Sequence, residues 1–305
     1  MIGYQAFAEL SQSHDCDKRG QAAHLAALAY LDHRGPADEH AALYAALIAF
    51  LDDTSVKVRA ALAFGLLHSH HAPRPVVLAL LQDSAIISRA VLQYSPVLID
   101  ADLLPIVARA ELSALIAISQ REVISSKLAA ALLARNDRGI ALRILQRPEV
   151  PIAESDLEKL TVTWAEEATV RGLLLKRRDL PSTARLILVQ KATESLKGCR
   201  LVKGALVEDR FNRVFRNSID AALAAIGEEE CAEGGDTYVG ALLSANQINT
   251  RLLIHAVVTG RVMFFAACLS VLTDTSRAKV FTLLQDGSRA ALDALFARGG
   301  LSQAS

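Results

Sequence analysis

Three histidines stand close together in the sequence, and their residue type could bind a metal ion. His68, His70 and His71 follow an apolar stretch at a point where a turn between two helices is expected. A tetrahedral zinc site needs several ligands directed at one ion, and neighbouring residues of one loop rarely achieve this. No nearby cysteine or carboxylate completes such a set, and the pair His14 and Cys16 is equally incomplete. We therefore expect a polar turn and no metal site.

His255 could take part in a different chemistry, the transfer of a phosphoryl group. It lies in the middle of an expected helix at 248–259, and Gly260 and Arg261 follow this helix. An exposed helical histidine can accept a phosphoryl group, but the basic residue expected directly beside such a histidine is absent. A partly buried or flanking histidine is the simpler interpretation. A phosphorelay-type signalling domain in the C-terminal part stays open as an alternative.

The sequence carries none of the common catalytic or cofactor-binding motifs. A glycine-rich phosphate loop, the G-x-S-x-G motif of hydrolases and the H-E-x-x-H motif of metalloproteases are all missing from it. Each of these motifs places particular side chains or backbone N–H groups where the reaction needs them. We therefore expect a protein that is not an enzyme and that needs no cofactor.

Basic residues are concentrated in one segment, 171–216. It holds twelve lysines and arginines against four acids, while the neighbouring segments 149–167 and 220–236 are acidic. Arginine binds carboxylates and phosphates through paired hydrogen bonds, so an acidic or phosphorylated segment of a protein partner would fit here. On the expected helix around 210–217 the arginines face away from Phe211 and Phe215, so the strip offers no interleaved aromatic side chains for base stacking. Over the whole chain 33 basic residues balance 33 acids, which also disfavours nucleic acid. The candidate partner-binding residues are Arg171, Lys176, Arg177, Arg178, Arg210, Arg213 and Arg216.

Helices are the elements expected to carry these side chains. Hydrophobic residues make up 52% of the chain and aromatic residues only 5%, while Ala and Leu, the strongest helix formers, dominate. The segment 56–62 returns as 86–92, with Arg59 matched by Arg89, and 147–151 returns as 177–181. Both repeats are shifted by thirty residues, and self-similarity at this period indicates stacked helical pairs. The chain is therefore expected to be all-α, with its first helices at 41–51, 56–67, 85–94, 100–109, 113–119, 125–134, 137–146, 153–162 and 165–176.

The repeat pattern fades after about residue 195, which divides the chain. We predict a repeat domain at 1–195 and a helical C-terminal domain at 196–305. In the second domain the segment Gly227–Asp236, with five acids and two adjacent glycines, is expected to be a loop or hinge. Further helices are expected at 237–245, 248–259, 262–272, 275–285 and 287–298.

Cysteine usage and hydropathy bear on the compartment. The four cysteines form no C-x-x-C pair, which favours free thiols in a reducing compartment over disulfide bonds. The first ten residues lack the basic and apolar regions of a signal peptide, and the longest uncharged apolar runs are too short to span a bilayer. We expect a cytoplasmic protein without a membrane segment.

The run from Asp53 to Ala63 resembles the second helix of HEAT-type repeats. With the thirty-residue units, the segment Leu252–Ala267 is similar to a bacterial family of unknown function that has short HEAT-like repeats and a helical C-terminal domain. The resemblance implies a right-handed α-solenoid followed by the helical domain, and it brings no catalytic residues. In stacked helical repeats, Arg59 and Arg89 would pair with acids such as Asp53 and Asp83 in a ladder between units.

These observations favour a protein–protein interaction scaffold or adaptor, which binds its partner on a concave helical face or on the basic segment. A HEAT-like DNA-binding or DNA-repair protein is an alternative. It would need a tryptophan and an aspartate in a basic groove, yet the single tryptophan, Trp164, is followed by Glu166 and Glu167. Acidic residues at that point would repel phosphates.

Overall fold

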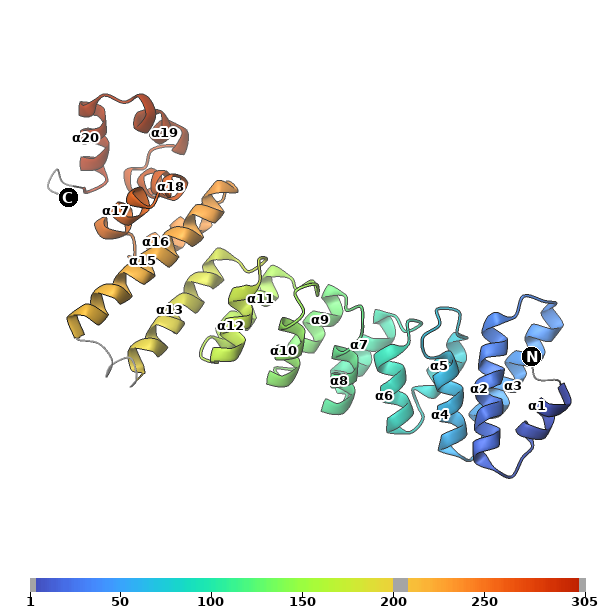
Figure 1. Ribbon diagram of the computed structural model, residues 1–305. Helices are drawn as coiled ribbons and strands as arrows, with labels where there is room; N and C mark the ends of the chain where they lie inside the picture. Colours follow the sequence, from blue (N-terminus) through green and yellow to red (C-terminus); the bar gives the residue numbers. More distant parts are fainter. Residues whose placement is uncertain (1–3, 200–207, 302–305) are drawn as a thin grey trace. The chain divides into compact units, whose positions relative to one another are not determined.

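The computed structural model of the protein describes residues 4–199 and 208–301. Within these residues helix is the only regular secondary structure, which confirms the prediction of an all-α protein (Figure 1). Contacts between Cα atoms divide the chain into two compact units, Met1–Ala153 and Glu154–Ser305, called unit 1 and unit 2 below. The predicted boundary after residue 195 refers to the end of the repeat pattern. It lies inside a helix of unit 2 and stays a prediction.

Unit 1 consists of short helices joined by tight turns. The helices predicted at 85–94 and 100–109 have the predicted bounds, and others differ by one to a few residues. Side chains fix three of the starts, because Asp15 accepts a hydrogen bond from the backbone N–H of Asp17, Ser125 from that of Leu128 and Asp137 from that of Ile140. The helices of unit 1 are α1 Tyr4–Ser11, α2 Cys16–Asp32, α3 Ala37–Leu51, α4 Val56–Leu66, α5 Arg74–Leu80, α6 Ala85–Tyr94, α7 Asp100–Arg109, α8 Leu112–Ser119, α9 Ser126–Leu133 and α10 Arg138–Leu145.

Unit 2 combines short helices with two long ones, α13 and α15. The five C-terminal helices predicted from the sequence are all present. None of the described helices is both long enough and apolar enough to cross a membrane. The helices of unit 2 are α11 Glu154–Trp164, α12 Ala168–Lys176, α13 Ser182–Gly198, α15 Glu208–Ala232, α16 Thr237–Ser244, α17 Thr250–Val258, α18 Val262–Thr273, α19 Arg277–Asp286 and α20 Arg289–Arg298.

The helices of unit 1 are arranged in pairs that stack on one another. Helices α2, α4, α6, α8 and α10 lie side by side in one row, each in contact with the next (Figure 1). Helix α5 packs on α6, α7 on α8 and α9 on α10, which closes the pairs. The apolar stripe of α4 faces inward, since Val58, Leu62 and Leu66 are all buried. Helices this short are marginal alone in water, so burial of these faces holds them in place.

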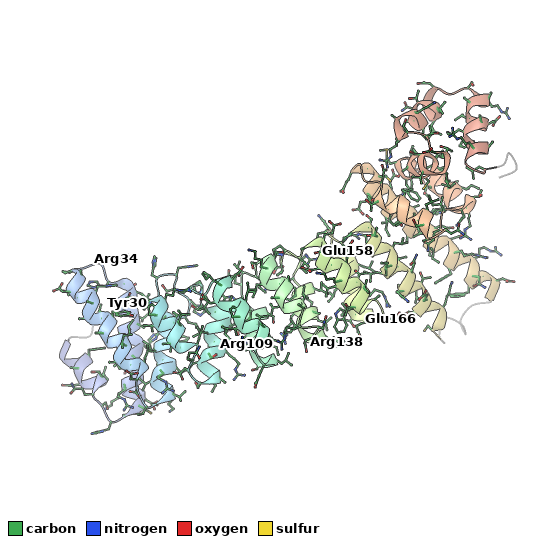
Figure 2. All side chains as sticks on the ribbon, turned by 180° about the vertical axis from the view of Figure 1, so that it is seen from behind. Tyr30, Arg34, Arg109, Arg138, Glu158 and Glu166 are labelled. Atoms are coloured by element: carbon green, nitrogen blue, oxygen red, sulfur yellow. The ribbon has the colours of Figure 1, made fainter. Side chains whose placement is uncertain are left out.

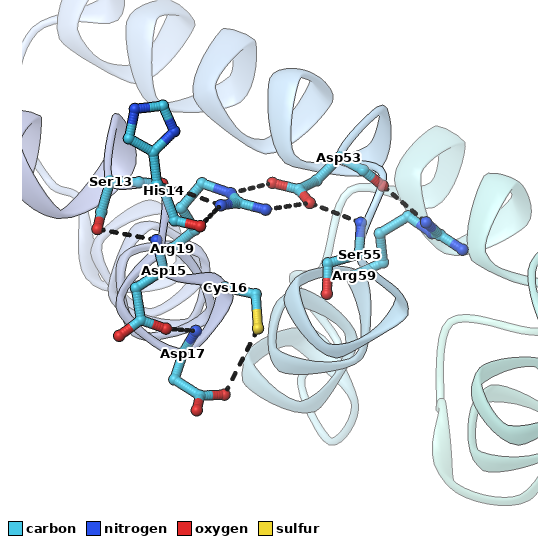
Figure 3. A network of polar contacts seen from close by, with 9 residues as sticks. All are labelled: Ser13, His14, Asp15, Cys16, Asp17, Arg19, Asp53, Ser55 and Arg59. Carbon is cyan, nitrogen blue, oxygen red and sulfur yellow. Dashed lines mark hydrogen bonds and ion pairs between the residues drawn. The ribbon is translucent and has the colours of Figure 1, made fainter.

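Arginine–aspartate pairs link the first helical pairs of unit 1, and Figure 3 shows the pair formed by Arg19 and Asp53. The guanidinium of Arg19 donates two hydrogen bonds to the carboxylate of Asp53, at 2.7 and 3.1 Å. Arg59 binds the carboxylate of Asp83 in the same way, at 2.6 and 2.9 Å, and also donates to the carbonyl oxygen of Asp53. A further pair, at a different position in the repeat, joins Arg74 of α5 to Asp102 of α7 at 2.6 Å. Arg89 is exposed and donates to the carbonyl oxygen of Ala85 in its own helix, so its predicted place in the ladder is wrong.

The loop predicted at Gly227–Asp236 is largely helical, which corrects the sequence interpretation. Helix α15 continues to Ala232, because glutamates favour helix and the helix buries Gly227 against α18. A Cβ atom at Gly227 would lie 2.2 Å from the ring of Phe264, so glycine allows this close approach. Two of the carboxylates that follow accept hydrogen bonds from backbone N–H groups of unit 2. Glu228 accepts from the backbone N–H of Phe264 at 2.8 Å, and Glu230 from that of Tyr238 at 2.8 Å.

Candidate protein-binding groove

Two adjoining grooves in unit 1 run along the turns at the ends of its helices. The first, of about 740 Å³, begins at the turn after α4 and crosses the turns after α6 and α8. The second, of about 480 Å³, crosses the turns after α8 and α10. Both are lined by Gln120, Arg121 and Glu122. We treat them as one continuous surface, called the turn groove below.

Arg121 builds the floor of the turn groove. Its guanidinium donates hydrogen bonds to the carbonyl oxygens of Leu92 at 2.6 Å, Ser95 at 2.9 Å and Leu98 at 3.4 Å. These carbonyls belong to the last turn of α6 and the segment after it, where a helix leaves acceptors unpaired and favours a positive charge. Burial lowers the pKa of Arg121, and the negative charge of Asp100 opposes this shift. An arginine from one helical pair therefore fixes the turn of the preceding pair.

Arg147 repeats this arrangement one pair further along. It donates to the carbonyl oxygens of Arg121 at 2.6 Å and Glu122 at 2.7 Å, in the turn after α8. It also pairs with the carboxylate of Glu149 at 2.8 Å. The turns after α6 and α8 are thus held by a buried and a half-buried arginine, each from the next turn along the stack.

Three glutamines lie at or near the ends of the helices that precede these turns. Gln93 lies in the last turn of α6, while Gln120 and Gln146 are the C-cap residues of α8 and α10. Gln93 is half-buried, and the other two are exposed. Within the described residues, none of the three amide side chains has a hydrogen-bonding partner. Each therefore offers one acceptor and two donors to a bound molecule.

Apolar and acidic side chains surround the first glutamines. Tyr94 is 48% exposed, and its ring packs edge-on against His68 with 5.3 Å between ring centroids. Val123 is 78% exposed, and Glu122 beside it is exposed as well. The turn groove therefore combines apolar contact surface, amide hydrogen bonding and a carboxylate, a combination suited to binding another polypeptide.

Part of the predicted basic strip lies inside unit 2 and is not available to a partner. Arg171 is 8% exposed and donates to the carbonyl oxygen of Ala165 at 2.7 Å. Arg177 is 4% exposed and binds the carboxylate of Asp179 through two hydrogen bonds, at 2.9 and 2.7 Å. Their inclusion in an exposed strip is therefore wrong, because both side chains stabilise the turns on either side of α12.

The remaining strip residues are exposed. Lys176 and Arg178 border the turn after α12, and three arginines line the first half of α15: Arg210, Arg213 and Arg216. Beneath these arginines Phe211 stacks on Phe215, and Lys197 of α13 lies 5.1 Å above the Phe215 ring. Arg200 and Lys203, which contribute to the charge of the segment, lie outside the described residues.

The histidines do not gather around a metal site. His68 and His70 line the turn groove. Among the described residues, the one cluster with metal-ligating atoms close together is Asp15, Cys16 and Asp17. Its two carboxylates have partners, since Asp15 accepts from the backbone N–H of Asp17 and Asp17 pairs with Lys57 (Figure 3).

The residues behind the two alternative functions lie in unit 2. His255 is half-buried on α17. Trp164 is half-buried at the end of α11, and Glu166, labelled in Figure 2, pairs with Lys191 at 3.0 Å. Neither His255 nor Trp164 lines the turn groove.

Sequence reasoning missed the turn groove, although a signal for it was present. Gln120-Arg121 returns as Gln146-Arg147 twenty-six residues later, each at the end of a helix. The matched arginines serve packing, while the matched glutamines face outward. A search for recurring polar residues at helix ends, rather than for recurring apolar ones, would have found the matched arginines and the matched glutamines.

Fold and groove together define an all-helical protein of stacked helical pairs. A family described as uncharacterised protein conserved in bacteria (DUF2336) matches residues 87–305, and the chain belongs to this family. The match begins inside α6 and includes all three groove glutamines. The predicted resemblance to a bacterial family of unknown function is confirmed at this level. No curated protein and no solved structure matches the chain.

Proposed function

We propose that the chain is a non-enzymatic scaffold or adaptor that binds another protein in the turn groove. We also propose that its stacked pairs are HEAT-like repeats forming a right-handed α-solenoid. The observation that carries the functional proposal is the pair of adjoining grooves, which share Gln120, Arg121 and Glu122 and cross the turns after α6, α8 and α10, with one unpaired amide at or near the end of each of these helices. A surface that is repeated along a stack suits an elongated partner better than a small molecule.

Two features of the groove support recognition of a protein. Its floor is fixed by arginine hydrogen bonds to backbone carbonyls, so little ordering entropy is lost when a partner binds. Exposed Tyr94 and Val123 provide the apolar contact that interface centres use, next to polar groups that set orientation.

The exposed part of the basic strip is a second proposed contact surface. Arg210, Arg213 and Arg216 recur every three residues on α15 and have no described partner, so they can bind an acidic or phosphorylated protein segment. Reversing Arg213 and Arg216 to glutamate should weaken such a contact, and should do so most at low salt. Partner binding by the reversed variant that equals wild-type binding at low salt would remove this surface from the proposal.

Site-specific photo-cross-linking tests the main proposal. The photoreactive residue benzoylphenylalanine is placed at Val123 in the groove, or at Val162 of α11, which is 74% exposed and lines neither groove. In cells of the bacterium that carries this chain, irradiation should join the Val123 variant to one protein, identified by mass spectrometry. The Val162 variant should not capture that protein. Capture of the same proteins at both positions, or of none at Val123, would refute the proposed binding site.

A further inference from the structure

The spacing of the three groove glutamines indicates how a partner is held. Gln93, Gln120 and Gln146 follow one another at intervals of twenty-seven and twenty-six residues, one for each successive helix of the row α6, α8 and α10. These three helices contact their neighbours directly. The amides therefore form a series with one member on each helical pair.

An amide side chain is chemically matched to a peptide backbone. Its carbonyl oxygen can accept a hydrogen bond from a backbone N–H, and its NH₂ group can donate to a backbone carbonyl. The three groove amides have no partners among the described residues, so no internal bond has to break before they bind. A backbone that is already paired within a helix could not use them, whereas an extended segment leaves its N–H and C=O groups free.

The distance between helical pairs also fits an extended chain. Packed helices lie about 8–10 Å apart, and an extended chain advances about 3.3 Å per residue. One glutamine would then meet about every third residue of the partner, and three glutamines would span about six residues. The turn groove reaches beyond Gln93 to His68 and His70, so it has room for a somewhat longer segment.

We propose that the turn groove binds an extended segment of a partner protein through a glutamine ladder made of Gln93, Gln120 and Gln146. The segment carries an apolar side chain that packs between Tyr94 and Val123, and a lysine or arginine that pairs with the exposed carboxylate of Glu122. This inference rests on the proposed scaffold function and adds to it the conformation and the chemistry of the bound segment.

The test uses the full chain and a library of random twelve-residue peptides displayed on phage. Peptides selected on the wild-type chain are synthesised, and their dissociation constants are measured by fluorescence polarisation. Replacing one groove glutamine by alanine should weaken binding about three- to tenfold, since one or two hydrogen bonds are lost. The triple variant Gln93→Ala, Gln120→Ala, Gln146→Ala should weaken it by more than about thirtyfold.

Matched controls separate the ladder from general effects. Gln12, Gln21 and Gln82 are exposed glutamines of unit 1 outside the groove, and their triple alanine variant should bind like the wild type. Methylating the backbone nitrogens of a selected peptide should weaken binding to the wild type, and much less to the groove triple variant. Thermal melts of both triple variants should match the wild type, because the side chains involved are exposed or half-buried and unpaired.

The possible failures are distinguishable. Selected peptides that bind the groove triple variant as tightly as the control variant would overturn the glutamine ladder. Selection of no peptide above background would overturn it too. A protein that cross-links at Val123 and is unaffected by the groove triple variant would leave the scaffold standing without the ladder. Absence of any protein cross-linked at Val123 would instead refute the scaffold proposal.

Discussion

Arg121 allows a direct test of how the turn groove is built. We consider Arg121→Met, which keeps most of the buried stem and removes the guanidinium. The substitution leaves the carbonyl oxygens of Leu92 and Ser95, which accept at 2.6 and 2.9 Å, without their donor. Leaving a buried acceptor unpaired costs about 1–3 kcal/mol. Removing the guanidinium also removes the desolvation penalty of a buried charge, which offsets part of this cost. The expected net loss is about 2–4 kcal/mol in the free energy of unfolding.

Urea unfolding followed by far-ultraviolet circular dichroism measures this loss. With a slope of about 2 kcal/mol per molar urea, the midpoint should fall by about 1–2 M. Arg89→Met is the matched control, because Arg89 is exposed and bonds only to Ala85 in its own helix. Its effect should stay within about 0.5 kcal/mol. Equal midpoints for the two variants would show that Arg121 does not hold the turn after α6, and the account of the groove floor would be wrong.

Three further predictions concern other parts of the chain. Gly227→Ala should destabilise unit 2 by about 1–3 kcal/mol through its clash with Phe264, while Gly172→Ala, on a helix with open space around it, should stabilise by about 0.5–1 kcal/mol; thermal melts compare the two. Burial raises the pKa values of the Cys231 and Cys268 thiols, so both should resist alkylation at neutral pH until denaturant is added. The half-buried Cys16 and Cys199 should react without denaturant, and peptide mass spectrometry can show the difference. The hydrogen bonds from Arg59 hold the pKa of Asp83 below its usual 3.8, so this pair stabilises the fold above that pH and the stabilisation is lost as the pH falls below it. Arg59→Met should therefore make acid unfolding curves less steep, and unchanged curves would contradict the pairing.

The sequence was sufficient to predict the helices, because their positions depend on local propensity and on apolar spacing. The bounds of α6 and α7 agree with prediction for this reason. The failures share a different cause. Gly227–Asp236 has the composition of a loop, yet the helix continues there because Phe264, distant in sequence, packs on Gly227. Tertiary contact overrides local preference at such points.

The candidate site was harder to predict than the fold. Charge count alone could not separate Arg177, buried against Asp179, from exposed Arg213, since both occur in the same basic segment. The groove depends on which side of a turn faces outward, and this is decided by Arg121 and Arg147 reaching back to the preceding turn. Such long-range hydrogen bonds leave only a faint repeat in the sequence.

The backward reach of these arginines also has a consequence for synthesis on the ribosome. The turn after α6 acquires its hydrogen-bond donor only when residue 121 has emerged, and the turn after α8 only when residue 147 has emerged. Protein chains fold progressively from the N-terminus as they are made. Each stretch of the turn groove should therefore form one step behind the growing end, after the helices beneath it are already in place.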